Sequence, residues 1–149
     1  MTPAGPTLVV LDAAAFDFLA STRGAELRAL LRRTTERGGR SCCAAVTLAE
    51  VCRGPARTRR VEAALARRYG GQRIRVVGTD ERLAKLVGGI LHHAKAGSER
   101  IADAHVVAVC AAADAAIVLT TDPDDIADLG PALPGCRIVV RRPDAPLAG

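Results

Sequence analysis

Short apolar runs alternate along this chain with segments of helical character, and this alternation limits the possible folds more than any other feature. The runs are almost continuously apolar, as strands buried on both faces are expected to be. Strands that alternate with helices form parallel sheets with helices packed on both faces. We therefore predict a three-layer α/β/α domain with a central, mainly parallel five-stranded sheet, whose strands are residues 7–11, 40–46, 73–77, 116–120 and 136–140.

The segments between these runs have sequence signals typical of helices. Leucines recur at i, i+3 and i+4 in the predicted helix 24–37, which gives it one apolar face. Thr47 stands three residues before Glu50, the spacing of a capping box, and this predicts a helix that begins at Thr47. The other helices are predicted at residues 13–20, 57–69, 79–95, 99–113 and 122–130.

A chain of 149 residues has the length of one ordinary domain. We assign residues 7–140 to that domain, with a short lead at residues 1–6 and a polar, proline-containing tail at residues 141–149. The lead has none of the features of a targeting segment. Because Asp114 interrupts the longest apolar stretch, we expect no membrane-spanning segment and no membrane partner.

The cysteines indicate the compartment. Their number is five, no Cys-x-x-Cys pair occurs, and most of them lie inside apolar runs. This usage is typical of reduced cysteines that serve as small core residues. We therefore expect a cytoplasmic protein.

The net charge of +5 suits a polyanionic partner such as a nucleic acid. Only three residues are aromatic, which argues against a platform on which single-stranded bases stack. One basic stretch could follow an RNA backbone or could be a solvated helix face; it consists of Arg53, Arg57, Arg59, Arg60, Arg67 and Arg68.

Four acidic residues stand at equivalent places beside the predicted strands. Asp12 ends the first strand, and Glu50 lies in the first turn of the helix after the second. Asp103 lies early in the helix that leads into the fourth strand, and Asp122 lies two residues beyond that strand. Carboxylates that converge at the carboxyl edge of a sheet repel one another unless a cation lies between them, and Mg²⁺ and Mn²⁺ prefer such ligands. The pattern therefore indicates a metal site suited to phosphodiester cleavage.

Each of these acids taken singly also has a structural explanation. Asp103 and Asp122 could interact with helix N-termini as a dipole partner and a cap. Glu50 could be half of a capping box. Asp12 fits this explanation less well, because it follows a buried strand directly. From spacing alone, helix capping and a metal site are about equally open.

Four segments resemble the motifs of PIN domains. Residues 8–16, LVVLDAAAF, are similar to the opening strand of these domains, which ends at the first acidic residue. Residues 46–54, VTLAEVCRG, resemble the second motif, a helix with a Glu and an Arg three residues later. Residues 101–108, IADAHVVA, resemble an Asp-Ala pair that opens an apolar helix, and residues 118–126, VLTTDPDDI, resemble a Thr-x-Asp-x-x-Asp turn. The likeness covers nearly the whole chain and implies a PIN-like fold.

Among PIN domains, the chain looks most like the VapC-like toxins of type II toxin–antitoxin modules. That resemblance implies an endoribonuclease that depends on Mg²⁺ or Mn²⁺ and cleaves an RNA substrate. It also implies a homodimer, and a small cognate antitoxin as partner. The predicted helix 79–95 and the Ala-rich helix 57–69 carry apolar surface that would suit pairing of two copies.

The resemblance also assigns roles residue by residue. Asp12 and Asp103 would be the principal metal ligands, and Glu50 and Asp122 would complete the acidic pocket directly or through water. Three further residues would have supporting roles: Asp125 as a fifth acid, Thr120 as a hydroxyl that orients an acid, and Arg53 as a group that neutralises the acids, contacts a substrate phosphate or forms a local ion pair.

Two positions depart from the family pattern. Ala14 stands where PIN domains commonly have Asn or Ser, and Arg100 stands where related toxins often have another acid. Ala14 keeps open an alternative function, a catalytically weakened PIN-like domain that binds RNA or a protein partner without cleavage. It also argues against a phosphotransferase of the haloacid-dehalogenase kind, which needs a second Asp two residues after a nucleophilic Asp12.

Overall fold

The computed structural model describes residues 6–146 and is built around a five-stranded parallel sheet. The strand order is β3-β2-β1-β4-β5, so the chain starts in the middle, builds to one edge and then returns to build the other. The predicted parallel sheet is therefore confirmed. Its strands are β1 (Leu8–Leu11), β2 (Arg40–Ala44), β3 (Arg75–Val77), β4 (Ala115–Leu119) and β5 (Arg137–Arg141).

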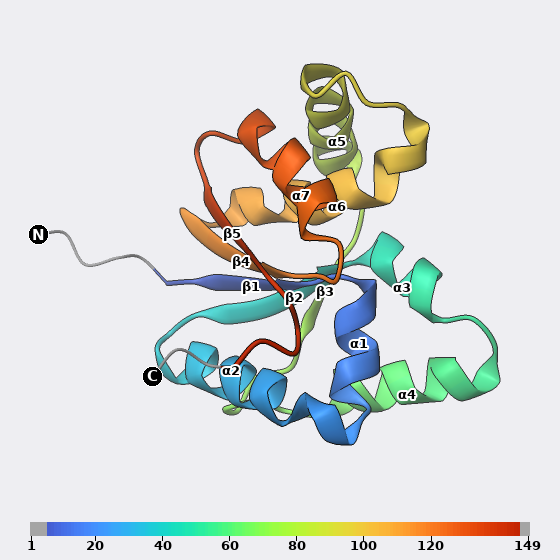
Figure 1. Ribbon diagram of the computed structural model, residues 1–149, viewed down its shortest axis with the longest axis vertical. Helices are drawn as coiled ribbons and strands as arrows, with labels where there is room; N and C mark the ends of the chain where they lie inside the picture. Colours follow the sequence, from blue (N-terminus) through green and yellow to red (C-terminus); the bar gives the residue numbers. More distant parts are fainter. Residues whose placement is uncertain (1–5, 147–149) are drawn as a thin grey trace, which may run out of the picture.

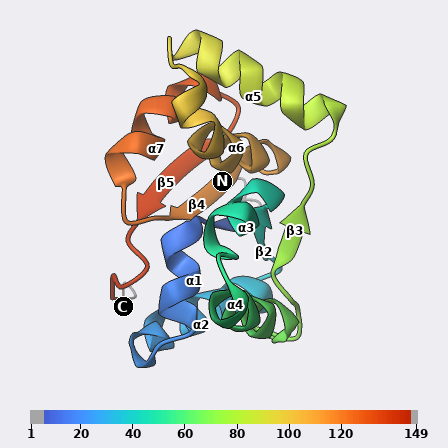
Figure 2. The ribbon, with the colours of Figure 1, turned by 90° about the vertical axis from the view of Figure 1, so that its right-hand side faces the viewer.

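Helices cover both faces of the sheet, which confirms the three layers (Figures 1 and 2). One layer contains α1 (Ala13–Leu19), α2 (Ala25–Glu36), α3 (Ala45–Val51) and α4 (Pro55–Ala66). The opposite layer contains α5 (Glu81–His93), α6 (Ile101–Val109) and α7 (Pro123–Leu129). Short 3-10 turns flank these helices, namely η1 (Thr22–Gly24), η2 (Ser98–Arg100), η3 (Cys110–Ala112) and η4 (Gly130–Ala132).

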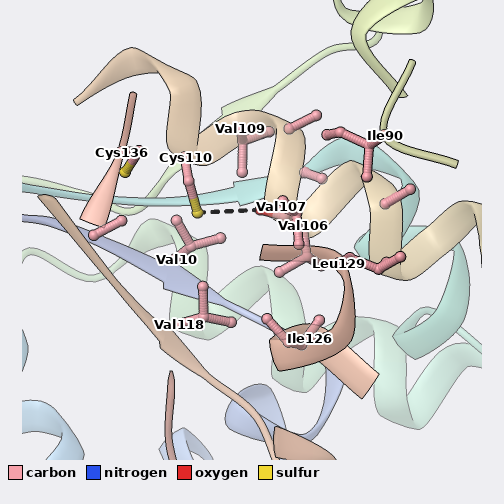
Figure 3. Close-up of a cluster of buried hydrophobic side chains, with 14 of the residues drawn as sticks. Val10, Ile90, Val106, Val107, Val109, Cys110, Val118, Ile126, Leu129 and Cys136 are labelled. Carbon is pink, nitrogen blue, oxygen red and sulfur yellow. Dashed lines mark hydrogen bonds between the residues drawn. The ribbon is translucent and has the colours of Figure 1, made fainter. Parts of the chain in front are cut away.

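The central strand β1 buries both of its faces, which explains its continuous apolar run in the sequence, whereas the edge strands β3 and β5 are partly exposed. Leu8 and Val10 belong to the core beneath α5, α6 and α7, and Figure 3 shows Val10 among its side chains. Val9 and Leu11, the alternate residues of the same strand, belong to the core on the α1–α4 side. Because successive side chains of a strand point to opposite faces, one short strand supplies both cores.

All five cysteines are free thiols, and four of them are buried. Burial raises the pKa of the Cys43 thiol to about 12 and that of Cys42 to about 12. Thiols with such pKa values stay protonated and unreactive near neutral pH. The structure therefore confirms that these residues serve as small core side chains.

The capping box predicted for Thr47 and Glu50 is wrong. Helix α3 begins at Ala45, with Ala44 in the N-cap position and no side-chain cap. Thr47 lies inside the first turn and is fully buried, and its hydroxyl has no hydrogen-bond partner within the described residues. The last residue of β2 leads directly into the helix, so the turn that a Thr47 cap would need does not exist.

The carboxyl ends of β1, β4 and β5 are tied together by backbone hydrogen bonds. The Asp12 amide donates to the Leu119 carbonyl at 3.0 Å, and the Thr120 amide donates to the Arg141 carbonyl at 3.0 Å. Strand β1 lies between β2 and β4. The connection from β1 to β2 runs through α1 and α2 on one face of the sheet, and the connection that enters β4 runs through α5 and α6 on the other. Such a switch point is where open α/β sheets bind their ligands.

None of the helices within residues 6–146 combines the length and the apolar composition that crossing a membrane requires.

Candidate active site

Asp12 follows the buried strand β1 and is the N-cap of α1. One carboxylate oxygen, Oδ1, accepts a hydrogen bond from the Ala13 amide at 2.8 Å. The other, Oδ2, accepts one from the Thr120 hydroxyl at 2.8 Å. The capping interpretation therefore holds for the acid where it was least expected. It leaves the carboxylate fixed in orientation and only partly buried.

Thr120 fixes two acidic residues through one hydroxyl. It is fully buried at the end of β4. Its hydroxyl donates to Asp12 and accepts a hydrogen bond from the backbone amide of Asp122 at 3.0 Å. A buried hydroxyl with both functions used holds the loop after β4 against the end of β1.

Asp122 occupies the N-cap position of α7, but its side chain makes no capping hydrogen bond. The capping explanation for this aspartate is therefore wrong. The helix begins with Pro123, whose missing amide needs no cap. The carboxylate is exposed, and its charge is one of those that raise the pKa of Asp103.

Glu50 lies near the end of α3, at the rim of the same edge. Its pKa is raised, first by partial burial, then by the charges of Asp12 and Asp103. Arg53 acts in the opposite direction and lowers it. Although much of the side chain is exposed to solvent, partial burial and the two neighbouring carboxylates together keep its pKa above the ordinary value.

Asp103 lies in the first turn of α6 and is partly buried. Its pKa is raised by burial, then by the charges of Asp12 and Asp125, while Arg100 lowers it. Asp103 thus interacts electrostatically with acids from three other elements. The structure brings Asp12, Glu50 and Asp122 close to Asp103. We call this group of four acids at the carboxyl ends of the strands the acidic edge.

This donor set fits a divalent cation in kind, because it consists of carboxylate oxygens that repel one another. Within residues 6–146, however, no three acidic, His or Cys side chains stand in a ready-made arrangement for holding a metal ion. For a cation to take three of these acids as ligands, their side chains have to move closer together. Asp12 and Asp103 would be the principal residues to hold it, and Glu50 would contribute.

Arg100 is the residue of this site whose contacts the sequence did not reveal. Its guanidinium lies 3.9 Å from Asp103 and 3.9 Å from Asp125. It also lies 3.8 Å from Asp128 and donates a hydrogen bond to the backbone carbonyl of Asp125. The i, i+3 spacing of Arg100 and Asp103 predicts the first contact, whereas the contacts to α7 depend on how the two helices pack.

Arg53 is exposed, and its Nε donates to the Ala49 carbonyl at 2.9 Å. Its guanidinium is therefore anchored to the preceding helix α3 and affects Glu50 only through its charge. Farther along the basic stretch, Arg57 lies 3.5 Å from Asp17.

His105 has a structural role. It is 7% exposed, and its Nδ1 forms a 2.8 Å hydrogen bond with the Ile101 carbonyl one turn earlier. His92 and His93 lie in the last turn of α5 and are exposed. The structure therefore shows no pair of histidines at the acidic edge within the described residues.

Comparison with known proteins gives an independent view of the fold. No curated protein sequence matches the chain. A chain in the crystal structure of VapBC2 from Rickettsia felis, bound to a DNA fragment from the promoter, has a similar fold with a TM-score of 0.60. The two are 9% identical, and the match covers 89% of this chain and 98% of that chain. This likeness concerns the fold alone.

A family model of the PIN domain matches residues 9–130. The matched range runs from β1 to the end of α7 and contains the four acids that meet at the carboxyl edge. The fold, the position of these acids and the match over most of the chain agree, and the chain belongs to the PIN domain family.

Proposed function

We propose that this protein is a divalent-metal-dependent endoribonuclease, the toxin of a toxin–antitoxin pair. The observation that carries the proposal is the electrostatic coupling of Asp12, Glu50 and Asp103. Partial burial and the neighbouring acids raise the pKa of both Glu50 and Asp103, as expected for carboxylates that share one site. Membership of the PIN family supports the nuclease activity.

In this proposal the acids act as oxygen ligands. Asp12 and Asp103 hold Mg²⁺ or Mn²⁺, and Glu50 and Asp122 contribute directly or through water. The bound ion would lower the pKa of a water molecule and stabilise charge on the phosphate. Thr120 keeps the Asp12 carboxylate in place, and Asp125 is a fifth acid at the rim.

The side-chain inventory favours water as the nucleophile. Ribonucleases that use the 2′-hydroxyl without a metal generally need paired acid–base groups of near-neutral pKa, most often His. Here His105 is buried and bonded to its own helix, and the other two histidines lie at the end of α5. The products should therefore carry 5′-phosphate and 3′-hydroxyl ends.

The test is cleavage of a labelled model RNA by the purified full chain. We expect cutting with Mn²⁺ or Mg²⁺, none in EDTA, and loss of cutting in Glu50→Gln. Glu81→Gln is the matched control, because Glu81 is an exposed glutamate paired with Lys85 on α5. Cyclic-phosphate ends, or cutting that persists in EDTA, would contradict the metal mechanism.

We also propose the partners that the toxin interpretation implies. The VapBC2 neighbour was crystallised as a toxin–antitoxin complex bound to promoter DNA. By analogy, this chain acts in the cytoplasm, binds a small antitoxin and forms a homodimer. Sedimentation at micromolar concentration tests the dimer, and co-expression with the product of an adjacent short reading frame tests the antitoxin.

A second candidate is a PIN-like domain that binds RNA or a protein partner without cutting. Two observations favour it: Ala14 lies at the start of α1 without a polar group, and no three acids form a ready-made metal cluster within residues 6–146. RNA binding by the wild-type protein that is equal in EDTA and Mn²⁺, with no cleavage product, would favour this candidate.

A further inference from the structure

Arg100 is the centre of an ion-pair group that joins two elements of the acidic edge. It is the last residue of η2, directly before α6, and its side chain is 23% exposed. Three carboxylates lie between 3.8 and 3.9 Å from its guanidinium nitrogens: one is Asp103 on α6, and two are Asp125 and Asp128 on α7.

The chemistry of arginine suits this position. The guanidinium stays charged at any physiological pH and offers several N–H donors in one plane, so it can face three carboxylates at once. It also donates to the backbone carbonyl of Asp125, a contact that fixes the α7 backbone and not only a mobile carboxylate. Arg100 therefore ties α7 to α6 and supplies positive charge to the acids.

The acids around Asp103 fall into two groups. Asp125 and Asp128 lie on the side where Arg100 neutralises them. Asp12 and Glu50 interact with Asp103 through their charges, and Arg100 forms an ion pair with neither of them within the described residues. Asp103 is the one carboxylate that belongs to both groups.

We propose that Arg100 is a built-in counter-cation that divides the acidic cluster. It occupies the Asp125–Asp128 side of Asp103 and leaves a single position for a divalent cation, between Asp103, Asp12 and Glu50. Arg100 is a positioning residue in this scheme, because it acts on the site through Asp103 and α7. The inference rests on the proposed metal site and adds to it the number of ions and the residue that limits it.

The proposal predicts two effects of opposite sign when the charge is removed. Without Arg100, the contact between α6 and α7 weakens, so the metal-free protein should unfold at a lower temperature. At the same time, Asp103 and Asp125 lose their counter-charge and repel each other, so divalent cations should bind more tightly. A residue with only a structural role would lower the unfolding temperature and leave cation binding unchanged or weaker.

The experiment is a calorimetric titration of the EDTA-treated full chain with Mn²⁺, with free Mn²⁺ followed by electron paramagnetic resonance. We expect the wild type to bind one ion per chain. Arg100→Gln should bind the first ion roughly tenfold more tightly or take up a second one. Arg100→Lys should stay near wild type because it keeps the charge. Arg32→Gln is the control, since Arg32 is an exposed arginine of α2 in the opposite layer.

The outcomes separate this inference from the proposed function. If the wild type binds one ion and Arg100→Gln binds one ion no more tightly, the inference is wrong and the metal site stands. If the wild type already binds two ions, the inference is also wrong. If Arg100→Gln alone binds Mn²⁺, Arg100 blocks the whole site and leaves no position for a cation, so both the inference and the metal dependence proposed for the wild type are wrong. If neither protein binds Mn²⁺, both proposals are wrong.

Discussion

The acidic edge has two sides, which we call the β1–β4 wall (Asp12 and Thr120) and the α6–α7 wall (Asp103, Asp125 and Asp128). Their acidic side chains are held in different ways. On the β1–β4 wall, Asp12 is held by two hydrogen bonds of 2.8 Å, one of them from a fully buried threonine at a strand end. On the α6–α7 wall, Asp103 and its neighbours are held by Arg100 through contacts of 3.8 to 3.9 Å, and the α7 carboxylates are 58% and 69% exposed.

The difference indicates that one wall is preorganised and the other adjustable. Short hydrogen bonds on a buried frame allow one side-chain orientation, whereas partly exposed ion pairs are individually weak and easily rearranged. Since no three acids in residues 6–146 are arranged to hold a metal ion, the movement that binding needs should come from the α6–α7 wall and from Glu50.

The largest expected effect is on the rate of RNA cleavage and comes from the preorganised β1–β4 wall. Asp12→Asn should lower the rate of RNA cleavage roughly 100-fold or more, because it removes a metal ligand whose orientation no other residue can replace. Initial rates on a labelled RNA in saturating Mn²⁺ measure this. Asp17→Asn, which changes an exposed aspartate of the same helix, should cleave at the wild-type rate. Equal rates for the two variants would remove Asp12 from the mechanism.

The next effect is on the free energy of unfolding and tests whether Thr120 holds the preorganised β1–β4 wall together. Thr120→Val should lower the free energy of unfolding by about 1–3 kcal/mol, because it deletes a buried hydroxyl that bonds to Asp12 and to the Asp122 amide. Thr120→Ser keeps the hydroxyl and should recover most of the loss. Urea unfolding of the three proteins gives these numbers. A serine variant as unstable as the valine variant would show that packing of the methyl group matters instead.

A smaller effect is expected on the adjustable wall. A double-mutant cycle of Arg100→Gln and Asp125→Asn should give a coupling energy of about 0.5–1 kcal/mol in metal-free buffer at low salt. Because the group is partly exposed, the coupling should fall toward zero in 1 M NaCl. Coupling of several kcal/mol that resists salt would show that this wall is as rigid as the other.

The smallest effect concerns pH. The pKa values of Glu50 and Asp103 are raised in the folded protein, so the folded chain holds these protons more firmly than the unfolded chain. Metal-free stability should therefore fall as pH rises from about 4, the ordinary carboxyl pKa, through the raised values. Glu50→Gln removes its share of this repulsion.

At pH 7 without metal, Glu50→Gln should raise the free energy of unfolding by less than about 0.5 kcal/mol, because solvent screens the charge of a side chain that is so exposed. Thermal unfolding of wild type and Glu50→Gln between pH 4 and 7 compares the two slopes. Stability of the wild type that rises over this range, with a parallel curve for the variant, would contradict the repulsion.

The sequence alone determined the fold class and the order of the elements. A strand buried on both faces has to be apolar at every position, and β1 is, so the parallel sheet with helices on both sides could be predicted. Helix α5 was also predictable, because Asp80 is its N-cap and accepts a hydrogen bond from the Leu83 amide. These signals depend on residues that are close together in the sequence and not on how the helices pack against one another.

Only the tertiary structure decided how the acidic residues are held. Sequence spacing proposed caps for Thr47 and Asp122, and neither side chain makes one. It did not reveal that Arg100 reaches α7, some 25 residues later in the chain. The first turn of α3 begins where β2 ends, and the pairing of Arg100 with α7 depends on how two helices pack. Both are properties of the assembled fold, and at these positions the local sequence pattern does not determine them.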